Sequence, residues 1–265
     1  MLTGVVALPL LILFVIYTNT VLFTALVCGI TFLALFEYYA MCLPAERARE
    51  RITAAGFGVL LVPLLSFHRP DLLTAGVVFS VLFFAIFFLL RFRDLNTVVQ
   101  HLTLLLFGLL YLPLLLGHLA LLRGLPFGRE WIFLVLLIVM AGDTAAYFTG
   151  VSLGRRKLYP AISPNKSIEG ALGGLAGSLV GALIAKFWFF PALILLDCAV
   201  LGLFLGVLGQ LGDLFESMLK RSFGVKDSGT IIPGHGGMLD RLDSLLFAFP
   251  PAYYYALLRF GGGAP

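Results

Sequence analysis

The sequence predicts an all-α, polytopic integral membrane protein with about nine transmembrane helices. Of its 265 residues, 60% are hydrophobic and only 12% are charged, whereas a soluble domain carries about 25% charged residues. The apolar residues form continuous runs, many near the roughly 17 to 25 residues that one helical crossing needs. Continuous rather than alternating runs favour helices over a closed barrel, the two structures that satisfy their backbone hydrogen bonds in lipid.

Residues 1–130 form the expected N-terminal transmembrane region, with five apolar runs. These runs are residues 5–17, 21–41, 52–67, 72–90 and 97–122. The first is short for a full crossing, so the first two runs form a helical hairpin or the first inserts only partly. Glu37 lies at the inner end of the second run, and its role is left open.

Residues 131–265 form the expected catalytic transmembrane region, with four further apolar runs. These runs are residues 131–150, 168–185, 187–211 and 238–260. The run at 168–185 is rich in glycine, which gives it a narrow face for close helix packing and for a possible homodimer. Asp197 lies near the outer end of its run, and its role is also left open.

The basic residues predict the orientation of these nine runs. Most of the eighteen lysines and arginines fall in the loops on one side, and a membrane protein keeps its basic loops in the cytoplasm. This rule places the N-terminus outside and turns the polar loops 152–167 and 209–244 toward the cytoplasm. We therefore expect a multi-pass protein of the cell (inner) membrane whose active site faces the cytoplasm.

The polar passage 209–244 contains the residues that first suggest chemistry. Asp213, Glu216 and Lys220 are spaced to form one stripe on a helix. This stripe is either a solvated helix end with a Glu–Lys pair or one wall of a site.

Two further acids, Asp240 and Asp243, stand three residues apart at the start of the last run. On one helix they would share a face, where the helix dipole favours acids. Together with Asp213 they could instead supply an all-oxygen Mg²⁺ site, since Mg²⁺ is commonly held by one or two carboxylates, water and substrate phosphates.

Residues 233–237, Pro-Gly-His-Gly-Gly, precede these last two acids. Glycines let a backbone approach a ligand closely, and free N–H groups at a helix start attract phosphate. The alternative is a plain glycine turn, in which His235 only caps the turn. The spacing is not that of a Walker A motif.

Asp143, Ser163 and Lys166 are the upstream candidates. Asp143 lies inside an apolar run, where an ionisable group marks a functional site unless it serves a structural hydrogen bond. Lys166 has hydroxyls on both sides near a helix start and suits a phosphate. Its alternative role is that of an ordinary basic anchor at the membrane surface.

Three segments together resemble the signature of the phosphatidate cytidylyltransferases, or CDP-diacylglycerol synthases. They read SMLKR at 217–221, VKDSG at 225–229 and PGHGGMLDRLDS at 233–244, and the upstream segments 143–150 and 162–170 are also similar to the family. The resemblance covers about residues 131–250, while the N-terminal half agrees only in being hydrophobic. Family members often have Lys-Thr after Ser-Pro-Lys, and this chain has Asn165-Lys166-Ser167, which keeps the lysine and the hydroxyl.

The resemblance implies an Mg²⁺-dependent transferase of phospholipid biosynthesis, which moves CMP from CTP to phosphatidic acid and yields CDP-diacylglycerol and pyrophosphate. It implies CTP, phosphatidic acid and membrane lipids as partners, and no nucleic acid. The implied metal ligands are Asp213, Asp240 and Asp243, and Asp143 and Lys166 are the other implied catalytic residues. The implied nucleotide-binding residues are Lys220, Arg221, Lys226, Gly234, His235, Gly236, Gly237 and Ser163.

Two other functions would also use aspartates within membrane helices. A transporter or lipid flippase would use Asp143 and Asp197 as relay residues in repeat-related spans, but the sequence has no internal repeat. A CDP-alcohol phosphotransferase would need the pattern DGxxAR…GxxxDxxxD, which is missing. The transporter remains the alternative.

Overall fold

The computed structural model describes residues 9, 12–66, 70–91, 95–231 and 236–260, most of them in helices. Contacts divide the chain into two compact units. Unit 1 comprises Met1–Gly124 together with Asp227–Asp240, and unit 2 comprises Leu125–Lys226 together with Arg241–Pro265. The division between residues 130 and 131, which the sequence suggested on functional grounds, stays a prediction.

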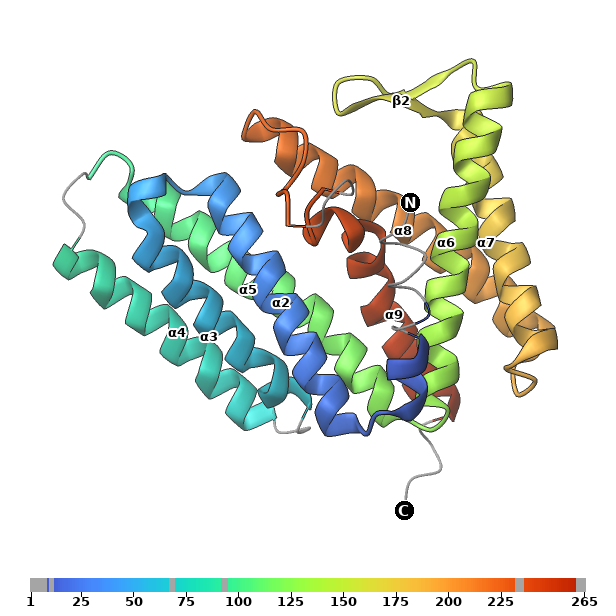
Figure 1. Ribbon diagram of the computed structural model, residues 1–265, viewed down its shortest axis with the longest axis horizontal. Helices are drawn as coiled ribbons and strands as arrows, with labels where there is room; N and C mark the ends of the chain where they lie inside the picture. Colours follow the sequence, from blue (N-terminus) through green and yellow to red (C-terminus); the bar gives the residue numbers. More distant parts are fainter. Residues whose placement is uncertain (1–8, 10–11, 67–69, 92–94, 232–235, 261–265) are drawn as a thin grey trace. The chain divides into compact units, whose positions relative to one another are not determined.

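Unit 1 is a group of antiparallel helices, and Figure 1 shows them lying side by side. The helices are α2 (Thr20–Cys42), η1 (Ala45–Arg47), α3 (Ala48–Ser66), α4 (Pro70–Arg91) and α5 (Val98–Gly124). Asn19 caps the start of α2 by accepting a hydrogen bond from the Leu22 N–H. The Tyr39 hydroxyl donates to the Leu105 carbonyl at 2.9 Å, which ties α2 to α5.

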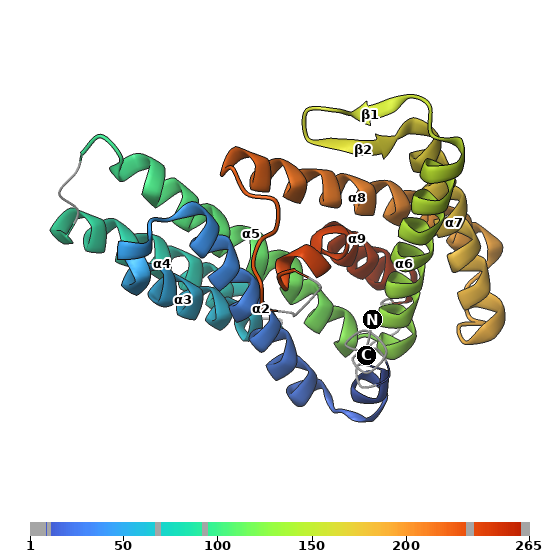
Figure 2. The ribbon, with the colours of Figure 1, turned by 45° about the horizontal axis from the view of Figure 1, so that its top comes forward.

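Unit 2 contains four long helices and a short hairpin. Its elements are α6 (Gly128–Leu153), β1 (Lys157–Tyr159), β2 (Ser163–Ser167), α7 (Ile168–Trp188), α8 (Leu195–Ser222) and α9 (Asp243–Phe260). The two strands pair antiparallel, with Lys157 opposite Ser167, and the hairpin extends beyond the ends of α6 and α7 (Figure 2). The boundary between Asp240 and Arg241 falls within a single turn, η2 (Leu239–Arg241).

The glycine-rich face of α7 packs against α6 of the same chain. A Cβ added to Gly177 would lie 2.6 Å from the Ala141 carbonyl oxygen, and one added to Gly173 would overlap the Thr149 side chain. Small residues allow two helix backbones to approach this closely in lipid. The face that we expected to be available for a homodimer is therefore covered by a helix of its own chain.

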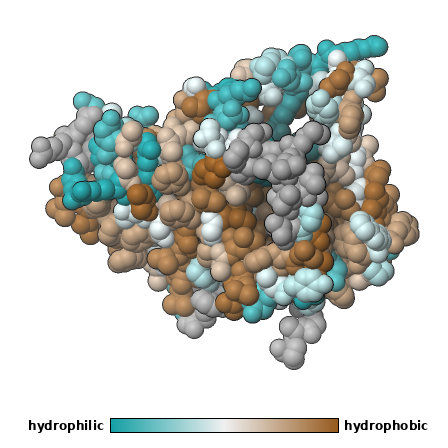
Figure 3. All heavy atoms as spheres, in the orientation of Figure 1, coloured by the Kyte–Doolittle hydropathy of each residue, from teal (hydrophilic) through white to brown (hydrophobic). Residues whose placement is uncertain are grey.

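Six of the described helices are long and apolar enough to cross a membrane, namely α2, α4, α5, α6, α7 and α8. They confirm an all-α, multi-pass membrane protein, while the expected count of nine spans is not confirmed. Helix α9 carries Pro250 and Pro251 and is not among the six. In Figure 3, hydrophilic residues gather at the hairpin end of unit 2.

Two expected boundaries are corrected. The eighth run was expected to be helical from Phe187, but α7 extends to Trp188 and α8 begins only at Leu195. Pro191 stands in the connection, and proline disfavours helix in the residue before it. The last helix was expected from about Met238, but it begins at Asp243, so Asp240 and Asp243 are not on one continuous helix.

Candidate active site

The predicted stripe of Asp213, Glu216 and Lys220 lies on α8 in unit 2, as expected from its spacing. Helix α8 continues to Ser222, so its last turns carry all three polar side chains. Lys166 on β2 reaches Asp213, with its Nζ 2.6 Å from Oδ2. Both side chains are partly exposed, 28% for Lys166 and 30% for Asp213, but the Lys166 Nζ itself is buried against the carboxylate.

Asp143 belongs to the same neighbourhood of unit 2. It stands on α6, is exposed, and lies within electrostatic range of Asp213 and Lys166. It also lines a small cavity with polar groups from Ser178 and Gln210. The structure thus brings together three residues that the sequence placed on separate segments.

Asp243 adds a further carboxylate to this group in unit 2. It is the first residue of α9, which is not one of the six candidate spans. Burial, and then the negative charges of Asp213 and Glu216, raise the pKa of its carboxyl above the usual range. A bound cation would relieve this repulsion.

The residues of this group fit a magnesium ion by the chemistry of their donors. Among the described residues, no cluster of three or more His, Cys, Asp or Glu side chains could hold a metal by itself. Mg²⁺ does not need such a cluster, because it commonly takes one or two carboxylates and completes its octahedron with water and substrate phosphates. Asp213 and Asp243 are the carboxylates in unit 2 best suited to this role.

Lys220 and Glu216 form a buried ion pair on α8, with Nζ 2.8 Å from Oε2. The side chain of Glu216 is fully buried and that of Lys220 is 10% exposed. The Glu–Lys pair that the sequence offered as the alternative to a functional role is therefore present. The phosphate contact proposed for Lys220 from the resemblance stays a prediction.

The other predicted phosphate-binding residues of unit 2 lie at its surface or on the hairpin. Arg221 is exposed and donates from Nη1 to the Val225 carbonyl at 2.9 Å, and Lys226 is exposed. Ser163 is partly buried at the start of β2. Their roles toward a nucleotide also stay predictions.

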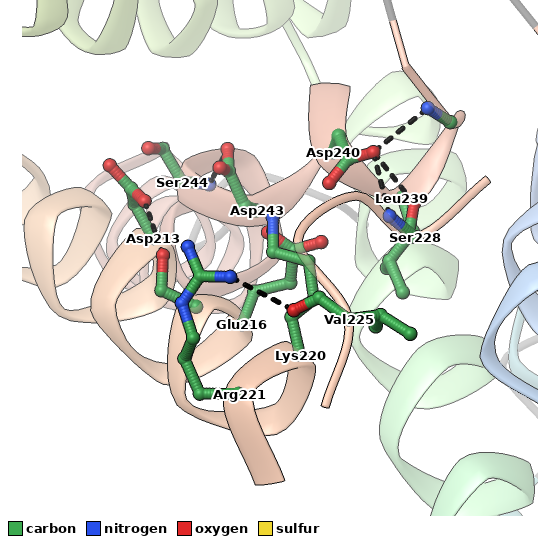
Figure 4. Close-up of polar contacts among 12 residues, drawn as sticks. Asp213, Glu216, Lys220, Arg221, Val225, Ser228, Leu239, Asp240, Asp243 and Ser244 are labelled. Carbon is green, nitrogen blue, oxygen red and sulfur yellow. Dashed lines mark hydrogen bonds and ion pairs between the residues drawn. The ribbon is translucent and has the colours of Figure 1, made fainter. Parts of the chain in front are cut away.

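In unit 1, Asp240 binds residues from both described parts of the polar segment 227–240, namely 227–231 and 236–240. Its Oδ2 accepts hydrogen bonds from the Ser228 N–H at 3.0 Å, the Ser228 hydroxyl at 3.0 Å and the Gly237 N–H at 2.8 Å (Figure 4). The carboxylate thus joins two parts of the segment that are about ten residues apart. Its predicted role as a metal ligand is not tested by these contacts.

Glu37 holds the same segment from α2, and the sequence did not predict this. It is 2% exposed, and it accepts from the Met238 N–H at 2.9 Å and the Leu239 N–H at 2.8 Å. The Ser228 hydroxyl lies 3.3 Å from its Oε2. The sequence showed only that Glu37 is an acid at the end of an apolar run. This position did not indicate which residues it contacts.

The glycine turn is described only in part. Gly234 and His235 lie outside the described residues, so their predicted contacts with a triphosphate stay predictions. Gly236 has a φ of 79°, a conformation that favours glycine. The N–H of Gly237 is donated to Asp240, so in this structure it serves the protein rather than a ligand.

Comparisons with known proteins identify the family to which the sequence is similar. A sequence model described as the cytidylyltransferase family matches residues 1–259. A phosphatidate cytidylyltransferase from Bacillus subtilis is 36% identical over 97% of this chain and 96% of its own length. Proteins of the same name from Staphylococcus haemolyticus and Staphylococcus aureus are 48% and 49% identical, each over 46% of this chain and 47% of their own length.

Proposed function

The chain belongs to the cytidylyltransferase family, and we propose that it transfers CMP from CTP to phosphatidic acid, giving CDP-diacylglycerol and pyrophosphate. The observation that carries the proposal is the 36% identity to a phosphatidate cytidylyltransferase over 97% of the chain. Six apolar helices agree with a lipid substrate that is reached inside a membrane. No comparison favours the transporter alternative.

The proposed reaction is a displacement at phosphorus. An oxygen of the phosphatidate phosphate attacks the α-phosphorus of CTP and forms a new P–O bond. The bond from the α-phosphorus to the oxygen that it shares with the β-phosphorus breaks, and pyrophosphate leaves with the electron pair. The nucleophile is already an anion, so no strong general base is needed.

Both reactants are anions, so the site must bring positive charge to where negative charge gathers. Lys166 is a candidate for this role, because its side chain is partly exposed and its ammonium lies beside Asp213, one of the proposed metal ligands. In the proposal it turns toward the phosphates of CTP. Arg221 and Lys226 are exposed and would add positive charge for the leaving pyrophosphate.

We assign Mg²⁺ to the carboxylates of unit 2. Asp213 and Asp243 would hold the ion, and Asp143 is close enough to Asp213 to serve as a further ligand or to orient water. A bound Mg²⁺ supplies charge neutralisation of the phosphate oxygens. Asp240 stays a proposed ligand on the strength of the family resemblance alone, because it and Asp243 do not share one helix.

The proposed site has a preferred side of the membrane and a route for its lipid substrate. The basic loops favour a cytoplasmic face for the site, where CTP is available. Phosphatidic acid would enter sideways from the inner leaflet, near Asp143. A homodimer remains possible only through a surface other than the glycine face of α7, since α6 covers that face.

A reconstitution assay tests the proposed function. Purified protein in mixed micelles would receive CTP and Mg²⁺ with phosphatidic acid, diacylglycerol or no lipid, and the lipid products would be separated by chromatography. The proposal expects a CDP-lipid with phosphatidic acid alone. Folded protein that forms none under these conditions would overturn it.

A further inference from the structure

Glu37 is an acid in the N-terminal helices that contacts the polar segment of the C-terminal half. Its partner Leu239 is 202 residues away in the sequence, yet Glu37 and the whole of segment 227–240 belong to unit 1. The resemblance to known enzymes covered the C-terminal half and left Glu37 without a role. The hydrogen bonds of Glu37 indicate a role for it.

The two oxygens of the Glu37 carboxylate serve different donors. Oε1 accepts from the Met238 N–H, and Oε2 accepts from the Leu239 N–H. Hydrogen bonds to an ionised group contribute about twice as much as neutral ones, and a buried carboxylate without them would be costly. The contacts therefore fix the backbone of residues 238 and 239 against α2.

Ser228 couples Glu37 to Asp240. Its Oγ lies 3.3 Å from Glu37 Oε2 and 3.0 Å from Asp240 Oδ2. A hydroxyl carries one proton, so this single donor is shared between two carboxylates. Glu37, Ser228 and Asp240 form one network, which we call the carboxylate clamp.

Two glycines make room for the clamp. A Cβ added to Gly229 would lie 2.6 Å from Glu37 Oε1, and one added to Gly237 would lie 2.6 Å from Glu37 Oε2. Carbon and oxygen do not approach this closely without a shift of the backbone or the side chain. We read Gly229 and Gly237 as glycines that a protein carboxylate requires, rather than glycines that a nucleotide requires.

We propose that Glu37 is a positioning residue for CMP transfer, which holds the backbone of Met238 and Leu239 and the side chain of Ser228 in the arrangement that receives CTP. The inference rests on the proposed function, because segment 227–240 contains the glycine turn assigned to the triphosphate. Glu37 engages the N–H groups of Met238 and Leu239, and Asp240 engages that of Gly237. Residues 237–239 are thus held by protein carboxylates on both sides of the shared Ser228 hydroxyl.

The isosteric substitution Glu37→Gln gives the sharpest test. An amide has one oxygen and one NH₂ group, so either orientation sets an NH₂ against the N–H of Met238 or of Leu239. One hydrogen bond is lost and two donors face each other, while size and shape are kept. We expect kcat/KM for CTP to fall about 10- to 100-fold, with the KM for phosphatidic acid unchanged.

The control is Thr31→Val, on the same helix. Thr31 is fully buried, and its hydroxyl donates to the Val27 carbonyl within α2. The substitution removes a buried polar group from α2 without touching the segment. Kinetics close to the parent are expected.

Amide hydrogen exchange supplies a readout that needs no activity. In Glu37→Gln, peptides covering 227–240 should exchange faster, while those from α5 keep the parent rate. Ser228→Ala, which removes only the shared hydroxyl, should shift both readouts in the same direction by a smaller factor, and it replaces Glu37→Gln if that variant does not fold. The inference would be overturned if the folded Glu37→Gln variant showed the parent rate of exchange in these peptides. It would also be overturned if kcat/KM for CTP in this variant stayed within twofold of the parent value. A parent chain that forms no CDP-lipid would overturn the proposed function instead, and the exchange data would still decide whether Glu37 holds the segment.

Discussion

The ammonium of Lys166 lies 2.6 Å from the Asp213 carboxylate, so the hairpin after α6 is tied to the first residue of the polar stripe on α8. The pair joins two segments that were assigned separate tasks, phosphate binding and metal binding. If Asp213 binds a metal as proposed, the ammonium of Lys166 has two possible partners, this carboxylate and a phosphate of CTP. In the proposed function, Asp213 would hold Mg²⁺, and Lys166 would then be available to a phosphate of CTP.

Lys166→Gln is expected to raise the KM for CTP about 10-fold or more, because a charge-assisted contact with phosphate is lost. Steady-state kinetics with CTP varied at saturating phosphatidic acid would measure the change. Lys157→Gln is the matched control, since Lys157 is exposed on the other strand of the same hairpin. Equal effects of the two substitutions would mean that Lys166 contributes only general positive charge and makes no specific contact with phosphate.

Removal of divalent cations should abolish CMP transfer. In the proposal, Asp213 and Asp243 hold a metal that neutralises the phosphates, and lysines alone do not replace it. Protein treated with a chelator would be dialysed and assayed with increasing Mg²⁺. Full activity in metal-free buffer would contradict the magnesium assignment and leave the family membership untouched.

The buried pair of Glu216 and Lys220 should matter for stability. Lys220→Met leaves the Glu216 carboxylate buried without its partner, and breaking such a pair costs about 3–5 kcal/mol. Thermal unfolding in detergent, followed by tryptophan fluorescence, would show the loss. The control is Glu50→Gln, which removes the partly exposed ion pair with Arg47 and should cost about 0–1 kcal/mol. Similar losses for both would mean that Lys220 is not held as the structure describes.

Gly237→Ala should impair the carboxylate clamp. The added Cβ would meet the Ser228 hydroxyl and Glu37 Oε2, so the segment must shift, and we expect kcat/KM for CTP to fall about 10-fold or more. Gly29→Ala is the matched control, because a Cβ there meets nothing within 4 Å. The same assay applies to both, and a Gly237→Ala variant with parent kinetics would argue that the segment accommodates the methyl group freely.

The sequence predicted those parts of the molecule that depend on composition and local spacing. Continuous apolar runs indicated the membrane helices, and the spacing of Asp213, Glu216 and Lys220 placed them correctly on one helix. The small residues of α7 indicated close packing, although the partner proved to be α6 of the same chain. Each of these features is encoded within a few helical turns.

Features that depend on distant contacts were not predictable in this way. The start of the last helix was misplaced, and the N–H groups of Met238 and Leu239 just before it bind Glu37, some 200 residues upstream. These bonds help hold a short turn where a continuous helix was expected. In a single sequence, Glu37 is one acid near a helix end, and its contacts with Met238 and Leu239 cannot be predicted.

The most direct test of the central claim follows the phosphorus atoms of CTP. The parent chain and Asp213→Asn would each receive CTP labelled at the α- or the γ-phosphate, with phosphatidic acid and Mg²⁺. We predict that α-label enters the lipid fraction, γ-label leaves as pyrophosphate, and the Asp213→Asn variant shows a loss of about 100-fold or more. If γ-label enters the lipid, or if Asp213→Asn transfers α-label at the parent rate, the proposed reaction or its assignment to this site is wrong.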